Sequence, residues 1–378
     1  MRLLPVGLLV FVPALLAAAP LQAVETAAWE PAAAAGTSSA SAPALRTTPD
    51  PVTPPPALRT VPVAPPIAAP SAARQYGPQR LGFQDGVAAA FDIPYQTIKG
   101  FRPLTLDLYQ PRPRDYPLPG IVFVHGGGFG GGDSRHAGTY DDFPAALAAL
   151  AAQGYVVASV NYRLSGEARF PAALLDIKAA VRWLRAHGGI DTTRVAVWGA
   201  GSGGQLAALA GVSCGVPALS ASEPANDAPS DCVQAVIDWY GPVDPRTAGE
   251  AGGFSATQSD AGAFLGCEPA ACPPGLAKLA SPLSYISATS PAFLIVHGAA
   301  DTLVPVAQSQ ALAAALKAKG APAELVVYPG LGQGLTRDGA PDLAANRQAL
   351  DKAASFLAAT FPPGPIGLKT AARRGPVY

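Results

Sequence analysis

The chain has 378 residues, with 26 Lys plus Arg balanced by 26 Asp plus Glu, and 49% of its residues are hydrophobic. This length suits one large α/β domain with extensions and lies well above the size at which a core is hard to bury. No run of Lys or Arg forms a basic stripe, so the charge pattern gives no reason to expect nucleic acid or an anionic membrane as a partner.

The first 75 residues predict an export signal followed by a linker. Met1 and Arg2 precede an apolar run, and small residues end at Ala23, which is the pattern of a signal peptide over residues 1–23. Residues 24–75 are mostly Ala, Pro, Ser and Thr, a composition that predicts a disordered tether. We therefore expect an exported protein (periplasmic, cell-surface or extracellular) with no transmembrane segment in the mature chain.

Residues 76–361 have the pattern of strands that alternate with crossover helices, and residues 362–378 predict a disordered tail. The expected strands cover residues 104–109, 121–125, 155–162, 195–198, 233–239, 293–297 and 324–328. Apolar residues recur at helical spacing in segments 174–184 and 312–316. This order predicts an α/β fold with a mostly parallel sheet and helices on both faces. Residues 242–291 interrupt it, and a cap or binding loops are expected there.

A glycine-rich loop, His125-Gly-Gly127-Gly128-Phe129, directly follows one expected strand. This context is typical of the HGGG motif, whose backbone N–H groups stabilise an oxyanion. A phosphate-binding loop is the competing interpretation, but no Lys-Ser/Thr pair follows the glycines and no acidic residue is placed for a dinucleotide. We expect no cofactor.

The segment Val195-Ala-Val-Trp-Gly199-Ala-Gly201-Ser202-Gly predicts a strand, a sharp turn and a helix start. In α/β-hydrolases this turn is the G-x-S-x-G elbow that carries the nucleophile. A motif that begins at Gly199 puts Gly201, which has no side chain, at the nucleophile position. A motif that begins at Ala200 is the alternative, and it would make Ser202 the nucleophile of an A-x-S-x-G elbow.

Together these stretches resemble the esterase and lipase branch of the α/β-hydrolases, close to the acetyl-xylan and feruloyl esterase-like (BD-FAE-like) carboxylesterases. The resemblance covers about residues 92–361, with matching segments at 104–109, 122–129, 158–167, 176–185, 280–283 and 295–305. It implies an α/β-hydrolase fold and a small-molecule substrate, either a short-chain ester or an acylated carbohydrate. It does not indicate the oligomeric state.

The resemblance also implies roles for individual positions. The family pattern W-G-x-S-A-G-G-H-L aligns without a gap to residues 198–206 and puts its serine on Gly201. The triad acid falls on Asp301, the base falls on Gln333, and the oxyanion hole falls on Gly127, Gly128 and the Ser202 N–H. Glutamine cannot take a proton at neutral pH, and no histidine follows His297 in the chain.

Three functions follow from these residues. The first is a secreted esterase-like protein with a degenerate triad and little or no hydrolytic activity. The second is an active carboxylesterase that uses Ser202 and an unrecognised base. The third is a non-catalytic scaffold that binds a ligand or a partner.

The four cysteines allow three disulfide connectivities, of which we favour Cys214–Cys232 and Cys267–Cys272. No histidine lies among them, so we expect no metal site.

Other polar and aromatic residues have simpler interpretations. His125 is expected beside the oxyanion loop, His136 and His187 at the surface, and His297 in the core or lining a pocket. Trp239 and Tyr240 are pocket candidates, whereas Asp141 and Asp142 predict the start of a helix.

Overall fold

A computed structural model describes residues 80–137, 140, 142–220, 228–244, 255–267 and 271–362. The predicted signal peptide and linker lie outside these residues. Residues 363–378 of the predicted tail and Asp141 also lie outside them.

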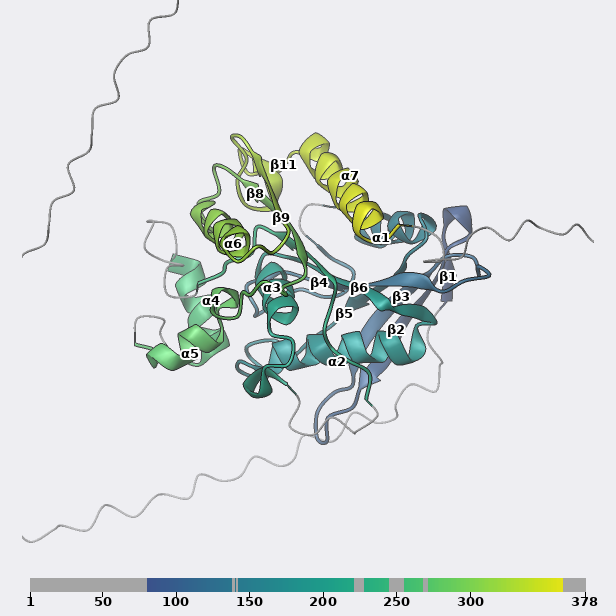
Figure 1. Cartoon of the computed structure of the whole chain (residues 1–378), viewed down its shortest axis with the longest axis horizontal. Coiled ribbons are helices and arrows are strands. Elements are labelled where there is room, and N and C mark those ends of the chain that lie inside the picture. Colours follow the sequence, from purple (N-terminus) through teal and green to yellow (C-terminus); the bar gives the residue numbers. More distant parts are fainter. Residues whose placement is uncertain are drawn as a thin grey trace, which may run out of the picture. The chain divides into compact units, whose positions relative to one another are not determined.

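Within the described residues, nine strands form one sheet in the order β1-β2-β3-β5-β4-β6-β7-β8-β9 (Figure 1). The strands are β1 (Arg80–Gly82), β2 (Ala88–Gln96), β3 (Leu104–Gln110), β4 (Leu118–Val124), β5 (Val156–Val160), β6 (Ile190–Ala200), β7 (Ala235–Trp239), β8 (Ala292–Gly298) and β9 (Ala323–Tyr328). Strands β1, β2 and β3 are antiparallel to their neighbours, and every pair from β5 through β4 to β9 is parallel. All seven predicted strands are present, and the predicted fold class, a mostly parallel α/β sheet, is confirmed.

The antiparallel strand β2 was not predicted, and its sequence explains why. Pro94 lies inside it, and Asp92 has a positive φ of 57°. The pairing with β3 shifts register between Ala90 and Ile93 and again between Pro94 and Gln96. These irregularities break the alternation of apolar and polar residues by which a strand is recognised in a sequence.

Helices cover both faces of the sheet. α1 (Phe143–Ala152) and α7 (Leu343–Thr360) pack on one face, and α2 (Ala172–His187), α3 (Ser202–Val212) and α6 (Ala307–Ala318) pack on the other (Figure 1). Successive residues of β6 alternate between these two cores, with Val197 in one and Trp198 in the other. This alternation is what a strand buried on both faces requires.

The smaller elements lie at the edges of this frame. The helices α4 (Ser255–Leu265) and α5 (Pro274–Leu279) fall in the segment that was expected to hold a cap or binding loops, and β10 (Thr336–Arg337) pairs with β11 (Ala340–Pro341). The predicted helix start before α1 is confirmed for Asp142, whose carboxylate accepts a hydrogen bond from the Ala145 N–H at 2.9 Å.

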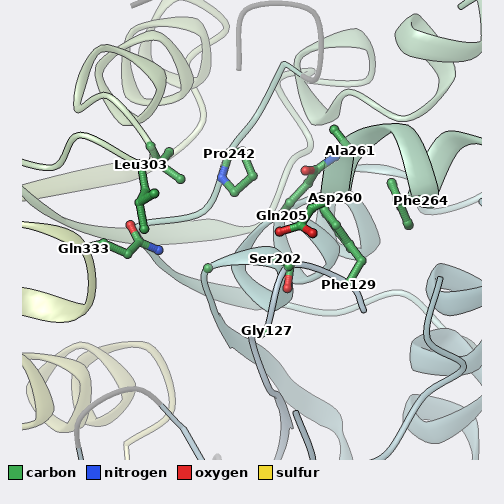
Figure 2. Close-up of a pocket in the computed structure, with 13 residues that line it drawn as sticks. Gly127, Phe129, Ser202, Gln205, Pro242, Asp260, Ala261, Phe264, Leu303 and Gln333 are labelled. Carbon is green, nitrogen blue, oxygen red and sulfur yellow. The ribbon is translucent and has the colours of Figure 1, made fainter. Parts of the chain in front are cut away.

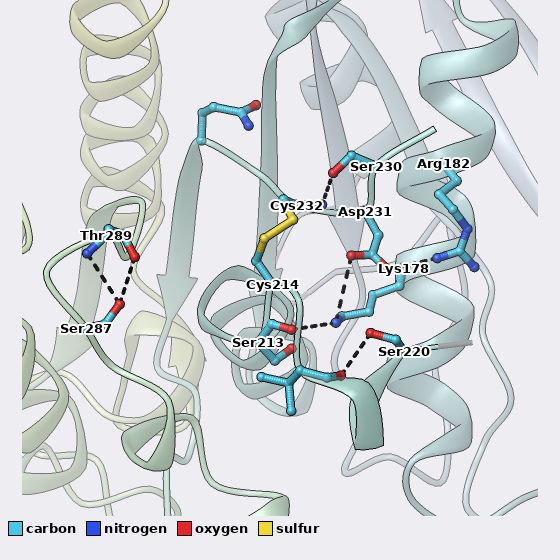
Figure 3. The surroundings of a disulfide bond; sticks show 12 residues. Lys178, Arg182, Ser213, Cys214, Ser220, Ser230, Asp231, Cys232, Ser287 and Thr289 are labelled. Atoms are coloured by element: carbon cyan, nitrogen blue, oxygen red, sulfur yellow. Dashed lines mark hydrogen bonds and ion pairs between the residues drawn. A yellow bond between two sulfur atoms is a disulfide. The ribbon is translucent and has the colours of Figure 1, made fainter. Parts of the chain in front are cut away.

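Two disulfides are present, and they are the favoured pairs, Cys214–Cys232 and Cys267–Cys272. Figure 3 shows the first, which joins the end of α3 to the segment that leads into β7. Beside it the buried Lys178 ammonium donates to the Ser213 carbonyl oxygen at 2.9 Å. Asp231 pairs with Arg182 of α2, also at 2.9 Å. The end of α3 is therefore held both by a covalent bond and by polar contacts to α2.

Candidate active site

The candidate site lies where the order of the parallel strands reverses, between β4 and β6. The chain leaves β4 toward β5 on one side and returns to form β6 on the other. In open α/β sheets such a switch point opens a crevice at the carboxyl ends of the strands, where ligands bind. The loop after β4 and the turn after β6 meet there.

The turn after β6 is centred on Gly201, which has φ 57° and ψ −123°. The glycines on either side of it are sterically required. A Cβ on Gly199 would collide with the Gly203 carbonyl, and a Cβ on Gly203 would collide with the carbonyl oxygens of Val124 and His125. Ser202 follows the turn as the first residue of α3. A Cβ on Gly204 would also collide, with the Asp238 carboxylate, so it is the conformation of Gly201 that centres the elbow on residue 201.

Gln333 lies directly opposite the elbow. Its Nε2 is 3.5 Å from the position that a Cβ on Gly201 would occupy, and its buried Oε1 has no hydrogen-bond partner within the described part of the chain. The loop before it packs on the turn after β8, because the Ala300 N–H donates to the Leu331 carbonyl oxygen at 2.8 Å. The loops after β8 and β9, which carry the expected acid and base positions, are thus fastened together.

Asp301, in the turn after β8, is buried and oriented by the backbone. Its Oδ1 accepts hydrogen bonds from the N–H groups of Leu303 at 2.8 Å and Val304 at 2.9 Å. Its Oδ2 has no hydrogen-bond partner among the described residues and lies 3.4 Å from the Nε2 of His297. In a working triad the outer carboxylate oxygen would accept a hydrogen bond from the imidazole N–H of the base and so orient the ring.

The glycine loop after β4 folds as a tight turn that exposes backbone to the site. Gly127 and Gly128 have φ values of 110° and 63°. The Gly127 carbonyl accepts hydrogen bonds from the N–H groups of Gly130 and Gly131 at 3.2 and 3.0 Å. Gly127, Gly128 and Ser202 line one cavity, so the three expected oxyanion-hole residues are brought together.

The Ser202 hydroxyl is buried and lies against the phenol of Tyr162. That phenol donates a hydrogen bond to the His125 carbonyl oxygen at 2.9 Å, and burial raises the pKa of Tyr162 far above neutrality. The His125 ring stacks on Tyr162 with 4.4 Å between ring centroids, and burial lowers the pKa of His125 to about 4. A phenol that stays protonated and a weakly basic imidazole are both poor acceptors for a serine proton.

Figure 2 shows the cavity beside the elbow, which has a volume of about 260 Å³. Its walls are mainly apolar, and they also carry four polar side chains, those of Ser202, Gln205, Asp260 and Gln333. The lining residues are Gly127, Gly128, Phe129, Gly201, Ser202, Gln205, Pro242, Asp260, Ala261, Phe264, Leu303, Val304 and Gln333. This mixture is typical of a small-molecule site.

A second cavity of about 270 Å³ also includes Gly127, Gly201 and Gln333 in its lining. Tyr240 lines it, as expected of a pocket residue, whereas Trp239 is buried in the core against Trp198. His136, expected at the surface, has a side chain that is 81% exposed and lies on the rim of this cavity, with its Nδ1 2.8 Å from Asp133.

The remaining histidines lie apart from the two cavities. His297 is fully buried, with its Nδ1 2.6 Å from the Ser309 hydroxyl and its Nε2 2.7 Å from the Val304 carbonyl oxygen. His187 is exposed at the end of α2. Sequence reasoning missed Asp260 and the position of His136 at the cavity rim, since neither residue belongs to a motif.

The described residues offer neither a metal centre nor a membrane-spanning helix. They contain no cluster of three or more His, Cys, Asp or Glu side chains arranged to hold a metal ion. No helix among them is both long enough and apolar enough to cross a bilayer.

The sheet order, the elbow after β6 and the glycine loop after β4 define an α/β-hydrolase of the esterase type. The BD-FAE family model matches residues 106–316, and the prolyl oligopeptidase family model matches residues 275–361. The first match spans more than half of the chain, and the chain therefore belongs to the BD-FAE family.

Named relatives agree with this assignment. Esterase LipQ of Mycobacterium tuberculosis is 32% identical over 240 residues, which cover 62% of this chain and 54% of LipQ. The chain spans about half the length of the curated relatives that it matches first.

Solved structures agree as well. A truncated carbohydrate esterase from gut microbiota is 27% identical with a TM-score of 0.57, covering 72% of this chain and 95% of the other. Esterase 2 of Thermogutta terrifontis, phosphonylated by sarin, is 27% identical with a TM-score of 0.60, covering 73% and 97%.

Proposed function

We propose that this protein is an exported, carboxylesterase-like α/β-hydrolase that binds small esters but does not hydrolyse them through an acyl-enzyme. The observation that carries this proposal is the pairing of Gly201 with Gln333. The backbone of residue 201 has the elbow conformation, and a glutamine amide lies 3.5 Å from the place of the missing Cβ.

Each of these two residues interrupts a different part of the reaction. Acyl transfer needs a nucleophilic atom at the elbow and a neighbouring base that takes its proton. Gly201 supplies no such atom, and the Gln333 amide accepts no proton near neutral pH. The oxyanion loop and Asp301 remain, and an oxyanion hole alone leaves roughly 10³- to 10⁴-fold catalysis over water.

Retention of a ligand site is supported by the cavity beside the elbow. A pure scaffold would have no need of an open cavity, yet about 260 Å³ remains between the glycine loop and α4. The esterase relatives and the carbohydrate esterase favour short-chain esters or acylated carbohydrates as the ligand class.

An active carboxylesterase that uses Ser202 is the second candidate, and the observation in its favour is that Ser202 borders the cavity. Its hydroxyl lies against Tyr162, whose raised pKa keeps the phenol protonated. The conformation of the elbow also disfavours this candidate, because the sharp turn (φ 57°, ψ −123°) lies at Gly201, whereas Ser202 is already the first residue of α3.

A fluorophosphonate probe tests the two candidates directly. We expect the purified chain to remain unlabelled under conditions in which an active serine esterase is labelled completely, and to release p-nitrophenol from p-nitrophenyl acetate no faster than the Ser202→Ala variant. Stoichiometric labelling that disappears in Ser202→Ala would overturn the proposal and establish the active enzyme.

Export is supported by the signal-like N-terminus and by two disulfides, which persist in oxidising compartments. Fractionation of cells that express the full chain, with N-terminal sequencing of the mature protein, tests it. We expect a new N-terminus after about Ala23 outside the cytoplasm. An uncleaved cytoplasmic chain contradicts export without affecting the proposal about the site.

A further inference from the structure

We infer that the cavity beside the elbow selects ligands that carry a positively charged alkylammonium group, and that Asp260 is the residue that recognises this group. The inference rests on the proposed ligand-binding function, because it uses the same cavity. It does not depend on the loss of the triad.

Asp260 reaches the cavity from α4, on the side opposite Gln333 (Figure 2). Its carboxylate packs directly against the oxyanion loop, so closely that a Cβ on Gly128 would collide with it. In the close-up the carboxylate lies among Gln205, Ser202 and Phe129. A negative charge is therefore held beside the backbone that would receive the ester carbonyl.

This charge has no counterion in the part of the chain that the structure describes. Two buried acids of the domain, by contrast, are paired: Asp107 with Arg135 at 2.8 Å, and Asp176 with Arg163 at 2.7 Å. No described ion pair includes Asp260, and no Lys, Arg or His lines the cavity. Burial raises the pKa of Asp260, because part of the carboxylate is removed from water.

The walls around the carboxylate match an organic cation better than a strongly hydrated one. Phe129 and Phe264 stack with 4.0 Å between ring centroids, and Ala261 and Pro242 extend the apolar lining. Aromatic rings and a carboxylate together stabilise an alkylammonium, whose methyl groups contact apolar surface while its charge is balanced. An anionic ligand would be repelled by Asp260 at the oxyanion loop.

The test compares two esters of nearly the same shape that differ in charge. Acetylcholine carries a trimethylammonium group, whereas 3,3-dimethylbutyl acetate carries a neutral tert-butyl group. Binding of each ester to the full chain is measured by ligand-observed NMR titration, for the wild type, for Asp260→Asn and for Asp115→Asn. The last variant is the control, because Asp115 is exposed and precedes the amino end of β4, away from the carboxyl ends where the cavity lies.

We expect the wild type and Asp115→Asn to prefer acetylcholine on the order of 5- to 10-fold, and added salt to weaken this preference. Asp260→Asn should lose the preference while its affinity for the neutral ester changes less than about twofold. Equal binding of the two esters by the wild type, or an undiminished preference in Asp260→Asn, overturns the inference and leaves the proposed function standing. Failure of both esters to bind would count against the ligand-binding function itself.

Discussion

Restoring the two missing groups of the elbow is the most direct test of the site. The double variant Gly201→Ser/Gln333→His puts a hydroxyl and an imidazole on opposite sides of a gap that the structure leaves open. Among the described residues, the only atom within 4 Å of a Cβ on residue 201, apart from its chain neighbours, is Nε2 of Gln333, at 3.5 Å. A Cβ on residue 201 therefore fits without a steric clash.

The cost of the change is backbone strain, and the gain is a complete triad. A side chain at φ 57° and ψ −123° is expected to destabilise the fold by about 1–3 kcal/mol, which a domain of this size tolerates. Because nucleophile and base act as a unit, either single variant should stay near background. The double variant should exceed both single variants by on the order of 10⁴ in kcat/KM.

The assay is hydrolysis of p-nitrophenyl acetate by the four chains, with circular dichroism to establish that each is folded. Addition of Asp301→Asn to the double variant is the control, and it should remove about 10⁴ of the gain, because Asp301 would orient the new imidazole. Activity in Gln333→His alone would refute the reasoning, since it would mean that a nucleophile other than residue 201, with Ser202 the nearest, was already in place.

Three further predictions concern stability. Burial raises the pKa of Asp238 to about 7, so the contribution of this carboxyl group to stability is complete below about pH 4 and is lost as the pH rises through 7. In urea titrations the free energy of unfolding of the wild type should therefore fall by up to ~4 kcal/mol more between these pH values than that of Asp238→Asn. Identical pH profiles of the two chains would contradict this. Replacing Cys214 and Cys232 together by Ser should lower the free energy of unfolding by about 3 kcal/mol, because the bridge closes a sequence separation of 18 residues, and an unchanged urea midpoint would refute that estimate. Gly199→Ala should destabilise by about 3 kcal/mol through collision with the facing backbone, whereas Gly275→Ala, which meets nothing within 4 Å, should be neutral or slightly stabilising; equal thermal shifts would argue against the register of the elbow.

The parallel strands could be predicted from the sequence because each is a short apolar run that ends in a turn. The register of the elbow could not. The glycines at 199, 201, 203 and 204 fit two motifs in the sequence, and the folded chain distinguishes them through the turn conformation of Gly201 (φ 57°, ψ −123°) and the position of Gln333 beside it.

The residues of α4 that line the cavity beside the elbow could not be predicted from the sequence either. Residues 242–291 could be recognised as an interruption of the β-α-β pattern, but no motif marks Asp260 there. Its place against Gly128 follows from how α4 packs on the glycine loop, which is a tertiary contact between distant segments.

The bond between Cys214 and Cys232 has a consequence for the site as well as for the fold. Helix α3 begins at the elbow and, about 16 Å away at 1.5 Å per residue, ends beside this bond. The Ser202 N–H, which would face an incoming carbonyl, thus lies at one end of a helix whose other end is fixed by the disulfide. When these two thiols stay reduced, α3 loses this constraint at its carboxyl end. The affinity for a ligand should therefore depend on whether the surroundings are oxidising.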